Sequence, residues 1–124
     1  MADESKELEQ GDLVEMDFLE RVMARIPNDV DVLEALGDLY TRVGRYEDGL
    51  AIDQKLTKLE PDDMTIWYNL GCSLALLNRR ESALAALKRA VELGYSDLDW
   101  MKQDSDLNSL REDKTFKALM SRIA

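Results

Sequence analysis

A fixed spacing of 34 residues organises the middle of the chain. Gly37 and Gly71 are separated by this spacing (71 − 37 = 34), and each follows a leucine. The residues around them align as well, because 33–40 match 67–74 in their apolar pattern. A period of this length is typical of helical solenoids, in which each helix pair buries its apolar face only by stacking on the next pair. The spacing therefore predicts an all-α, antiparallel helix-pair solenoid.

The residues at fixed places in each unit resemble the tetratricopeptide repeat. The skeleton of that family is a large apolar residue, then Leu-Gly, an aromatic residue, Ala and finally Pro. The first unit, 30–63, supplies Leu33, Leu36, Gly37, Tyr40, Gly44, Tyr46, Leu59 and Pro61. The second unit, 64–97, supplies Trp67, Leu70, Gly71, Leu74, Ala83, Leu87 and Ala90. The resemblance implies a tetratricopeptide-type superhelix of the small bacterial kind.

Two positions of the first unit depart from the family pattern. Gly49 stands where the family usually has Ala, and Asp53 stands where it usually has an aromatic or large apolar residue. These departures predict either a looser second helix in that unit or a contact made there by another segment.

The chain before the first full unit is predicted to divide at Gly11. Residues 1–11 are acidic and polar, and we expect them to be flexible. Asp12 is a suitable N-cap for a helix over 13–26, and one face of that helix is apolar. This face carries Val14, Phe18, Val22 and Ile26, with Leu19 and Met23 beside them. Residues 12–29 fit the second half of an incomplete repeat; a non-repeat helix that covers the exposed end fits equally well.

Turn residues give the helix boundaries in the rest of the chain. The repeats are expected to contain helices over 30–43, 46–59, 64–77 and 80–93. After residue 97 the period breaks, and short helices are predicted over 97–102 and 114–123. Because a solenoid end exposes apolar surface, residues 98–124 are predicted to be a C-terminal capping segment. Its side chains Trp100, Leu107, Leu110 and Phe116 are expected to lie against Leu87 and Val91.

Composition narrows the classes of function. The net charge of −10 disfavours a nucleic-acid backbone or an anionic membrane as partner. The absence of His removes the commonest general base and metal ligand, and a single Cys cannot form an intrachain disulfide or a cysteine-based zinc site. The amino terminus does not resemble a signal peptide, and the longest apolar run, 74–77, is too short to span a bilayer. We therefore expect a cytoplasmic protein with no cofactor and no bound metal.

The family resemblance implies a binding groove on the concave face, which the first helix of each pair lines. Carried over to this sequence, the groove residues are Asp31, Glu34, Asp38, Arg42, Thr65, Tyr68, Asn69 and Cys72. An acidic half thus lies beside a half with tyrosine and apolar residues. A partner peptide or helix with Lys or Arg and an apolar face suits such a groove. The alternative is that the acidic residues only form a solvated helix surface.

Other kinds of site are poorly supported by the sequence. Asn69 matches the central Asn of the carboxylate clamp in one group of the family, but its acidic neighbours would repel a carboxylate. The run 104–108 resembles the start of a calcium loop, yet Ser109 replaces the required Gly and Thr115 replaces the bidentate Glu. Turn and capping chemistry explains this run better. No phosphate-binding loop or catalytic triad is present, so the chain is predicted not to be an enzyme.

The sequence therefore predicts a non-catalytic protein–protein interaction module. As an adaptor or scaffold, it would bind a peptide or helix of a partner in its groove. Two alternatives stay open. One is a small acidic chaperone for a secreted or assembly-prone client, and the other is a protein that forms a homo-oligomer through its exposed repeat ends.

Overall fold

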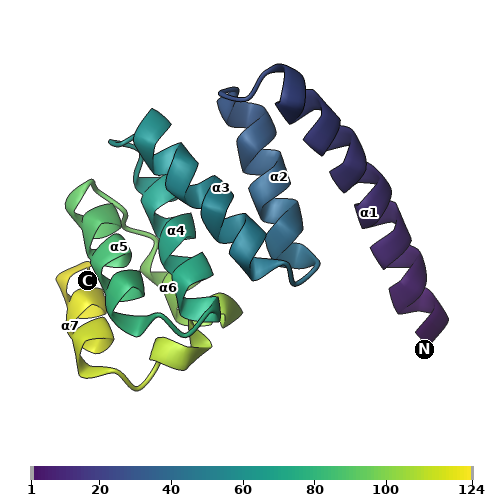
Figure 1. The fold of residues 1–124 in the computed structure, drawn as a ribbon. Coiled ribbons are helices and arrows are strands. Elements are labelled where there is room, and N and C mark those ends of the chain that lie inside the picture. Colours follow the sequence, from purple (N-terminus) through teal and green to yellow (C-terminus); the bar gives the residue numbers. More distant parts are fainter. Residues whose placement is uncertain (1, 124) are drawn as a thin grey trace.

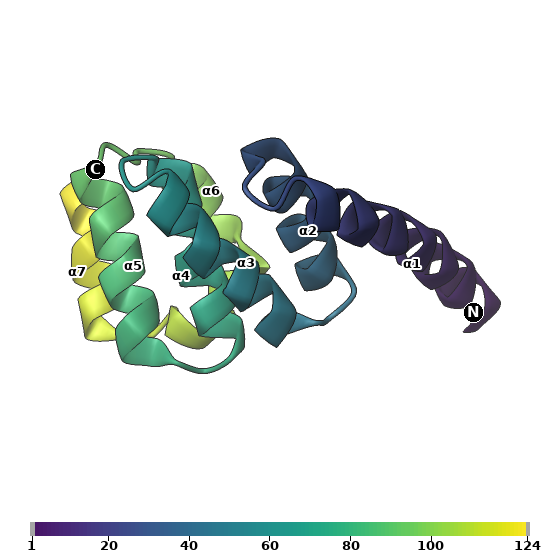
Figure 2. The ribbon, with the colours of Figure 1, turned by 45° about the horizontal axis from the view of Figure 1, so that its top comes forward.

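The computed structural model describes residues 2–123, which form helices and contain no strand. The long helices are α1 (Ala2–Arg25), α2 (Val30–Arg42), α3 (Tyr46–Leu59), α4 (Met64–Leu76), α5 (Arg80–Glu92) and α7 (Lys114–Ile123). A short helix, α6 (Leu98–Gln103), and a 3-10 helix, η1 (Ser105–Leu110), connect α5 to α7. Helices α1 to α5 lie in chain order, with α1 and α7 at opposite ends of the array (Figure 1 and Figure 2). Each of these helices packs on the next, which confirms the predicted all-α helix-pair solenoid.

The 34-residue spacing reappears in the residues that start the helices. Asp29, Asp63 and Asp97 follow one another at this spacing and are the N-caps of α2, α4 and α6. Each carboxylate accepts a hydrogen bond from a backbone N–H of the first turn, at 2.9 to 3.0 Å. Such a cap satisfies an N–H that the helix itself leaves without an acceptor, and it contributes about 1 kcal/mol. The α-helices that follow α1 accordingly begin and end within one residue of the predicted positions.

The first helix of each repeat ends at an equivalent residue in the left-handed conformation. Gly44, after α2, has a φ of 85°, and Asn78, after α4, has a φ of 58°. Their N–H groups donate to the carbonyls of Thr41 and Ala75, at 3.1 and 3.0 Å. Gly lacks a Cβ and Asn tolerates this conformation, so both residues end a helix and reverse the chain. The second helix of each repeat therefore runs antiparallel to the first.

Each helix pair closes where an apolar side chain packs onto a helical glycine. A Cβ on Gly37 would lie 3.0 Å from Cγ2 of Ile52, and a Cβ on Gly71 would lie 2.7 Å from Cγ of Leu87. A side chain at either glycine would displace a buried neighbour, because protein interiors have few voids. The two glycines thus allow the helices of each pair to approach closely, as their shared position in the repeats predicts.

The C-terminal segment covers the end of the second repeat. Leu107 and Phe116 are 0% exposed and Leu110 is 1% exposed, and all three belong to the core cluster that contains Leu87. Val91 packs at the edge of this cluster. These three side chains therefore pack with Leu87 as expected, and the capping role of residues 98–124 stays a prediction.

Trp100 is an exception to the expected packing. Its side chain is 52% exposed and lies outside the core cluster, so the prediction that it packs on Leu87 and Val91 is wrong. Met101, at 0% exposed, occupies the buried place in α6 instead. Because α6 has only six residues, a shift of one position decides which side chain faces the core.

Helix α1 begins earlier than the sequence predicts. The expected break at Gly11, with an N-cap at Asp12, is wrong, since α1 continues from Ala2 through both residues. A helical glycine costs about 1 kcal/mol relative to alanine, and the strong helix formers before Gly11 compensate for this. Met1, the first residue of the segment expected to be flexible, lies outside the described residues. No helix in the described part of the chain, including the 24 residues of α1, is long and apolar enough to cross a membrane.

Helix α1 also packs through a different face from the one predicted. Met16 is 2% exposed and Met23 is partly buried, both in the core cluster of the first repeat. Val14, Phe18 and Ile26 are 73%, 62% and 45% exposed, so this part of the predicted apolar face is the outer one, whereas Leu19 and Met23 beside it pack on the core cluster. Helix α1 has apolar residues on two sides, and helical periodicity alone does not show which side packs on α2.

Substitution of the two phenylalanines tests this packing. Phe116→Ala is expected to lower the free energy of unfolding by about 3–5 kcal/mol, because it leaves a cavity in the core. Phe18→Ala removes the same atoms from a side chain that is 62% exposed, and it should change the free energy of unfolding by at most about 0.5 kcal/mol. Urea unfolding of dilute protein, followed by circular dichroism, measures both values. Equal losses in the two variants would contradict the placement of α7 and of the outer face of α1.

Candidate functional site

A cavity of about 190 Å³ lies between the first helices of the two repeats and the turn that joins α6 to η1. Its lining comes from α2, α3, α4, α6 and the residues that begin η1. Five of the lining side chains carry carboxyl groups: Glu34, Asp38, Asp53, Asp104 and Asp106. No Lys or Arg is among the described residues that line it.

The cavity brings together part of the predicted groove. Five of the eight predicted residues line it: Glu34, Asp38, Tyr68, Asn69 and Cys72. The other three do not: Asp31, Arg42 and Thr65. Arg42 instead pairs with Asp38 at 3.1 Å and with Asp12 at 3.2 Å, on the exposed side of α2. The structure therefore gathers two of the three acidic residues of the prediction and leaves its single cation outside the cavity.

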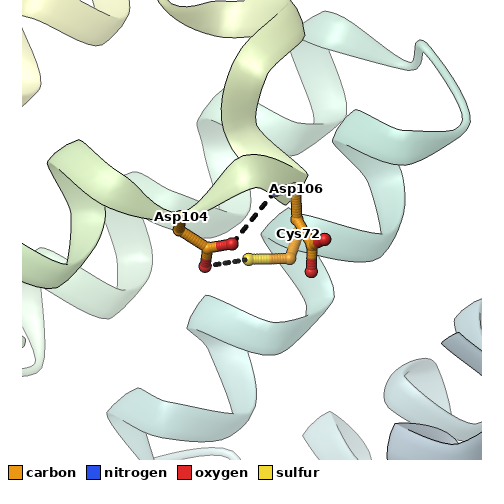
Figure 3. Close-up of side chains that lie close together, drawn as sticks. All are labelled: Cys72, Asp104 and Asp106. Carbon is orange, nitrogen blue, oxygen red and sulfur yellow. Dashed lines mark hydrogen bonds between the residues drawn. The ribbon is translucent and has the colours of Figure 1, made fainter. Parts of the chain in front are cut away.

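The turn between α6 and η1 holds Tyr68 and Cys72 inside the molecule. Oδ2 of Asp104 accepts hydrogen bonds from the Tyr68 hydroxyl at 2.6 Å and from the Cys72 thiol at 3.6 Å. Oδ1 of Asp104 accepts from the backbone N–H of Asp106 at 3.0 Å, and Figure 3 shows Cys72, Asp104 and Asp106 close together. The ring of Tyr95 stacks on that of Tyr68, with ring centroids 4.4 Å apart. Tyr68 and Cys72 are only 4% and 6% exposed, so they form part of the inner wall of the cavity.

Whether Cys72, Asp104 and Asp106 could together bind a metal ion depends on the protonation of the Cys72 thiol. The ligand atoms of Cys72, Asp104 and Asp106 lie within 4.8 Å of one another. Burial, followed by the charge of Asp104, raises the pKa of the Cys72 thiol well above its ordinary value, which keeps it protonated. A metal ligand would have to be the thiolate, and both oxygens of Asp104 already accept hydrogen bonds. The groups fit a hydrogen-bonded turn better than a metal site, and Asp104 is the N-cap of η1.

Asp53 is a buried carboxyl group in the cavity wall. It is 7% exposed and accepts a hydrogen bond from the hydroxyl of Ser73. Burial raises the pKa of Asp53 to about 6; the Ser73 hydrogen bond opposes this shift, and the charge of Asp38 adds to it. The sequence predicted either a looser α3 or a contact from another segment at this position. Helix α3 is continuous, and Ser73 of α4 makes the contact.

Negative charge and an aromatic surface meet at the mouth of the cavity. Burial raises the pKa of Glu34 and of Asp106, and neighbouring carboxylates raise both further. Carboxyl groups shifted in this way are stabilised in their charged form by a nearby cation. Trp100, which is 52% exposed, lines the same cavity and presents an indole beside the acidic residues. This combination suits a cationic side chain.

Sequence reasoning missed seven residues of the cavity wall. Three of them, Gly37, Thr41 and Ser73, lie in the repeat helices α2 and α4, and the other four are Asp53, Trp100, Asp104 and Asp106. The repeat period gave no indication of the last three, because they follow the second repeat and Asp104 bonds to residues 32 and 36 positions earlier. Asp53 did carry a signal, since it places a carboxyl group where the repeat usually has an apolar residue.

Comparison with known proteins agrees with the observed helix-pair fold. A family model described as tetratricopeptide repeat matches residues 65–93, which include most of α4 and all of α5. A chloroplastic protein of Arabidopsis thaliana is 28% identical over 109 residues, which are 86% of this chain and 32% of that protein. The peroxisomal targeting signal receptor of Candida glabrata is 35% identical over 65 residues, or 52% of this chain and 11% of that protein. The chain thus spans about a third or less of the length of these relatives.

A solved structure of MamA has the same fold. It superposes with a TM-score of 0.74 at 24% sequence identity, over 96% of this chain and 72% of that one. The superposition includes most of the helix array. A protein with a substantially different sequence therefore stacks its helix pairs in the same way.

Asp53→Asn tests the buried carboxyl group. An unfolded Asp has a pKa near 3.9, whereas that of Asp53 is raised to about 6. The folded state therefore binds more protons between these values, and the free energy of unfolding falls as the pH rises through them. The Asn variant lacks this titration, so its stability relative to wild type should rise by about 1–3 kcal/mol from about pH 4 to about pH 7.

Urea unfolding at the two pH values measures this change. The matched control is Asp99→Asn, at an exposed position of α6, which should show a smaller change. A stability difference between Asp53→Asn and wild type that is the same at both pH values would show that the carboxyl group is not buried as described.

Proposed function

Because the chain is a tetratricopeptide repeat protein, we propose that it is a protein–protein interaction module that binds a basic side chain of its partner in the acidic cavity. The partner segment is a peptide or helix that carries Lys or Arg beside an apolar residue. The observation that carries the proposal is the composition of the cavity wall, which contains five carboxyl groups and, among the described residues, no Lys or Arg.

The charge of the cavity favours a cation over a neutral ligand. After burial, repulsion from Asp104 and Asp38, which also line the cavity, raises the pKa of Asp106. The carboxylates that raise the pKa of Glu34 after burial are Asp63, Asp31 and Glu60, which do not line the cavity. A bound Lys or Arg removes part of this repulsion, and it acts in a partly buried place where water screens charges less. It should therefore contribute more than an isolated surface ion pair, which is worth about 0–1 kcal/mol. Glu34 and Asp38, at the exposed edge, would also attract a basic partner before contact.

The shape of the cavity limits what can enter it. At about 190 Å³ it can hold one side chain but not a whole helix. The α6–η1 turn covers the inner wall through the bonds of Asp104, so a partner has access to Glu34, Asp38, Asn69 and Trp100. The indole of Trp100 can contact a cation over its face, worth about 0.5–2 kcal/mol. The exposed amide of Asn69 can pair with a peptide backbone as donor and acceptor.

Two further observations support a binding role rather than catalysis. The single cysteine is buried and protonated, so it lacks the thiolate character that a nucleophile needs. One relative of the chain is named as the receptor of a targeting signal, and that similarity covers 52% of this chain. Receptor function in a relative favours recognition of a partner as the role of these repeats.

Reversal of charge at the edge of the cavity tests the proposal. Affinity purification from the source cell, followed by quantitative mass spectrometry, would compare wild type with a Glu34→Lys, Asp38→Lys variant. Partners that bind through a basic side chain should be depleted at least tenfold, because two attractive charges become repulsive, and tenfold corresponds to about 1.4 kcal/mol.

The matched control is a Glu81→Lys, Glu92→Lys variant. It changes the net charge equally, at two exposed positions of α5 that do not line the cavity. The control should recover the same partners as wild type. If the cavity variant also recovers every partner at wild-type levels, the cavity is not the binding site.

A further inference from the structure

Helix α1 carries half of the large exposed apolar side chains among the described residues. Of the six large apolar side chains that are exposed, three lie on α1 and a fourth directly follows it: Leu13, Val14, Phe18 and Ile26. Val14 and Phe18 lie about 40° apart around the helix, whereas Leu13 is about 140° from Phe18. The outer surface of α1 therefore consists mainly of Val14 and Phe18, two of its most exposed apolar side chains. Since Met16 and Met23 already attach α1 to α2 through the opposite side, this outer surface has no partner within the described chain.

The outer surface combines a protruding side chain with a gap. Phe18 is 62% exposed, and Gly11 lies seven residues earlier, almost two helical turns away on the same face. Val14 lies between them and is 73% exposed. Nothing lies within 4 Å of the place that a Cβ of Gly11 would occupy. Gly11 thus differs from Gly37 and Gly71, each of which receives an apolar side chain from a neighbouring antiparallel helix.

We propose that two copies of the chain form a dimer in which the outer faces of their α1 helices pack antiparallel, with Phe18 of each copy on Gly11 of the other. The contact repeats one that the fold already uses twice, where Ile52 packs on Gly37 and Leu87 on Gly71. Phe18 stands 34 residues before Ile52, at the equivalent position. The place that matches Gly37 is occupied by Asp3 (37 − 34 = 3), so in the proposed dimer Gly11 of the second copy supplies the glycine.

The arrangement favours a second copy of this chain over an unrelated helix. A two-fold interface must be self-complementary. The outer face of α1 meets this condition because Phe18 and Gly11 lie on the same stripe, so Phe18 of each copy can pack on Gly11 of the other. When Gly11 lies opposite Phe18, the two antiparallel helices cross the two-fold axis at position (11 + 18)/2 = 14.5. This point is close to the middle of α1, at (2 + 25)/2 = 13.5. The two helices therefore overlap over almost their whole length.

Charge and position also permit this dimer. Asp17 and Arg21 form an ion pair at 2.8 Å on exposed α1, so this part of the acidic chain carries both signs. Helix α1 stands at one end of the array, away from α5 and α7 (Figure 1 and Figure 2). A second copy can lie against it without meeting the rest of the first, and the acidic cavity is not part of the contact.

Sedimentation velocity over a concentration series up to the sub-millimolar range tests the dimer. Wild type should change from the monomer mass of 14.2 kDa to twice that mass as concentration rises. Phe18→Glu should stay monomeric, whereas Ala24→Glu, which adds the same charge at an exposed position off the stripe, should dimerise like wild type. Gly11→Leu fits the monomer and should weaken dimerisation at least tenfold by occupying the place of Phe18.

A crosslinking measurement tests the register. In the proposed arrangement Val14 lies next to Val14 of the second copy, so Val14→Cys should form a disulfide-linked dimer on oxidation, and Ala24→Cys should not. Wild type that stays monomeric throughout, a dimer that survives Phe18→Glu, or assembly beyond two copies would each overturn the proposal. Circular dichroism checks that every variant remains helical, so loss of the dimer cannot be mistaken for unfolding.

Discussion

The structure depends on the contact between an apolar side chain and a helical glycine. Leu87 on Gly71 and Ile52 on Gly37 bring the two helices of each repeat together at a distance that any larger residue would prevent. Because the two glycines recur after 34 residues, and the aspartate caps recur with them, each pair stacks on the next in the same way. The position of the acidic cavity follows from this regular stacking, since α2 and α4 are the equivalent helices of successive pairs.

The function proposed for the cavity rests on the residues after the repeats. Without the α6–η1 turn, the second repeat would present Tyr68 and Cys72 on an open groove. Asp104 bonds to both side chains and thereby changes the groove into a small acidic cavity with a covered inner wall. Arg111 fixes this turn in place, since its guanidinium donates to the backbone carbonyl of Met101 at 2.7 Å and to that of Asp104. The residues after the repeats therefore shape the cavity as well as contributing Leu107, Leu110 and Phe116 to the core.

The sequence predicted the repeats well because their determinants are local. Caps, turn glycines and the 34-residue spacing gave the helices after α1 almost to the residue. The sequence did not predict which side of α1 is buried. Apolar residues occur on both sides of this helix, and contact with α2 determines which of them are buried. The covering of Tyr68 was also out of reach. It depends on Asp104, which is 36 positions away and outside the repeat period.

The most direct test of this account is the reactivity of Cys72, the only cysteine in the chain. If the α6–η1 turn covers the second repeat, the buried and protonated thiol should react with a bulky aromatic disulfide reagent at least about a hundredfold more slowly than in urea-unfolded protein, because only the thiolate is nucleophilic. Rapid and complete modification of the native, folded protein would show that the groove is open, and it would contradict the covered acidic cavity.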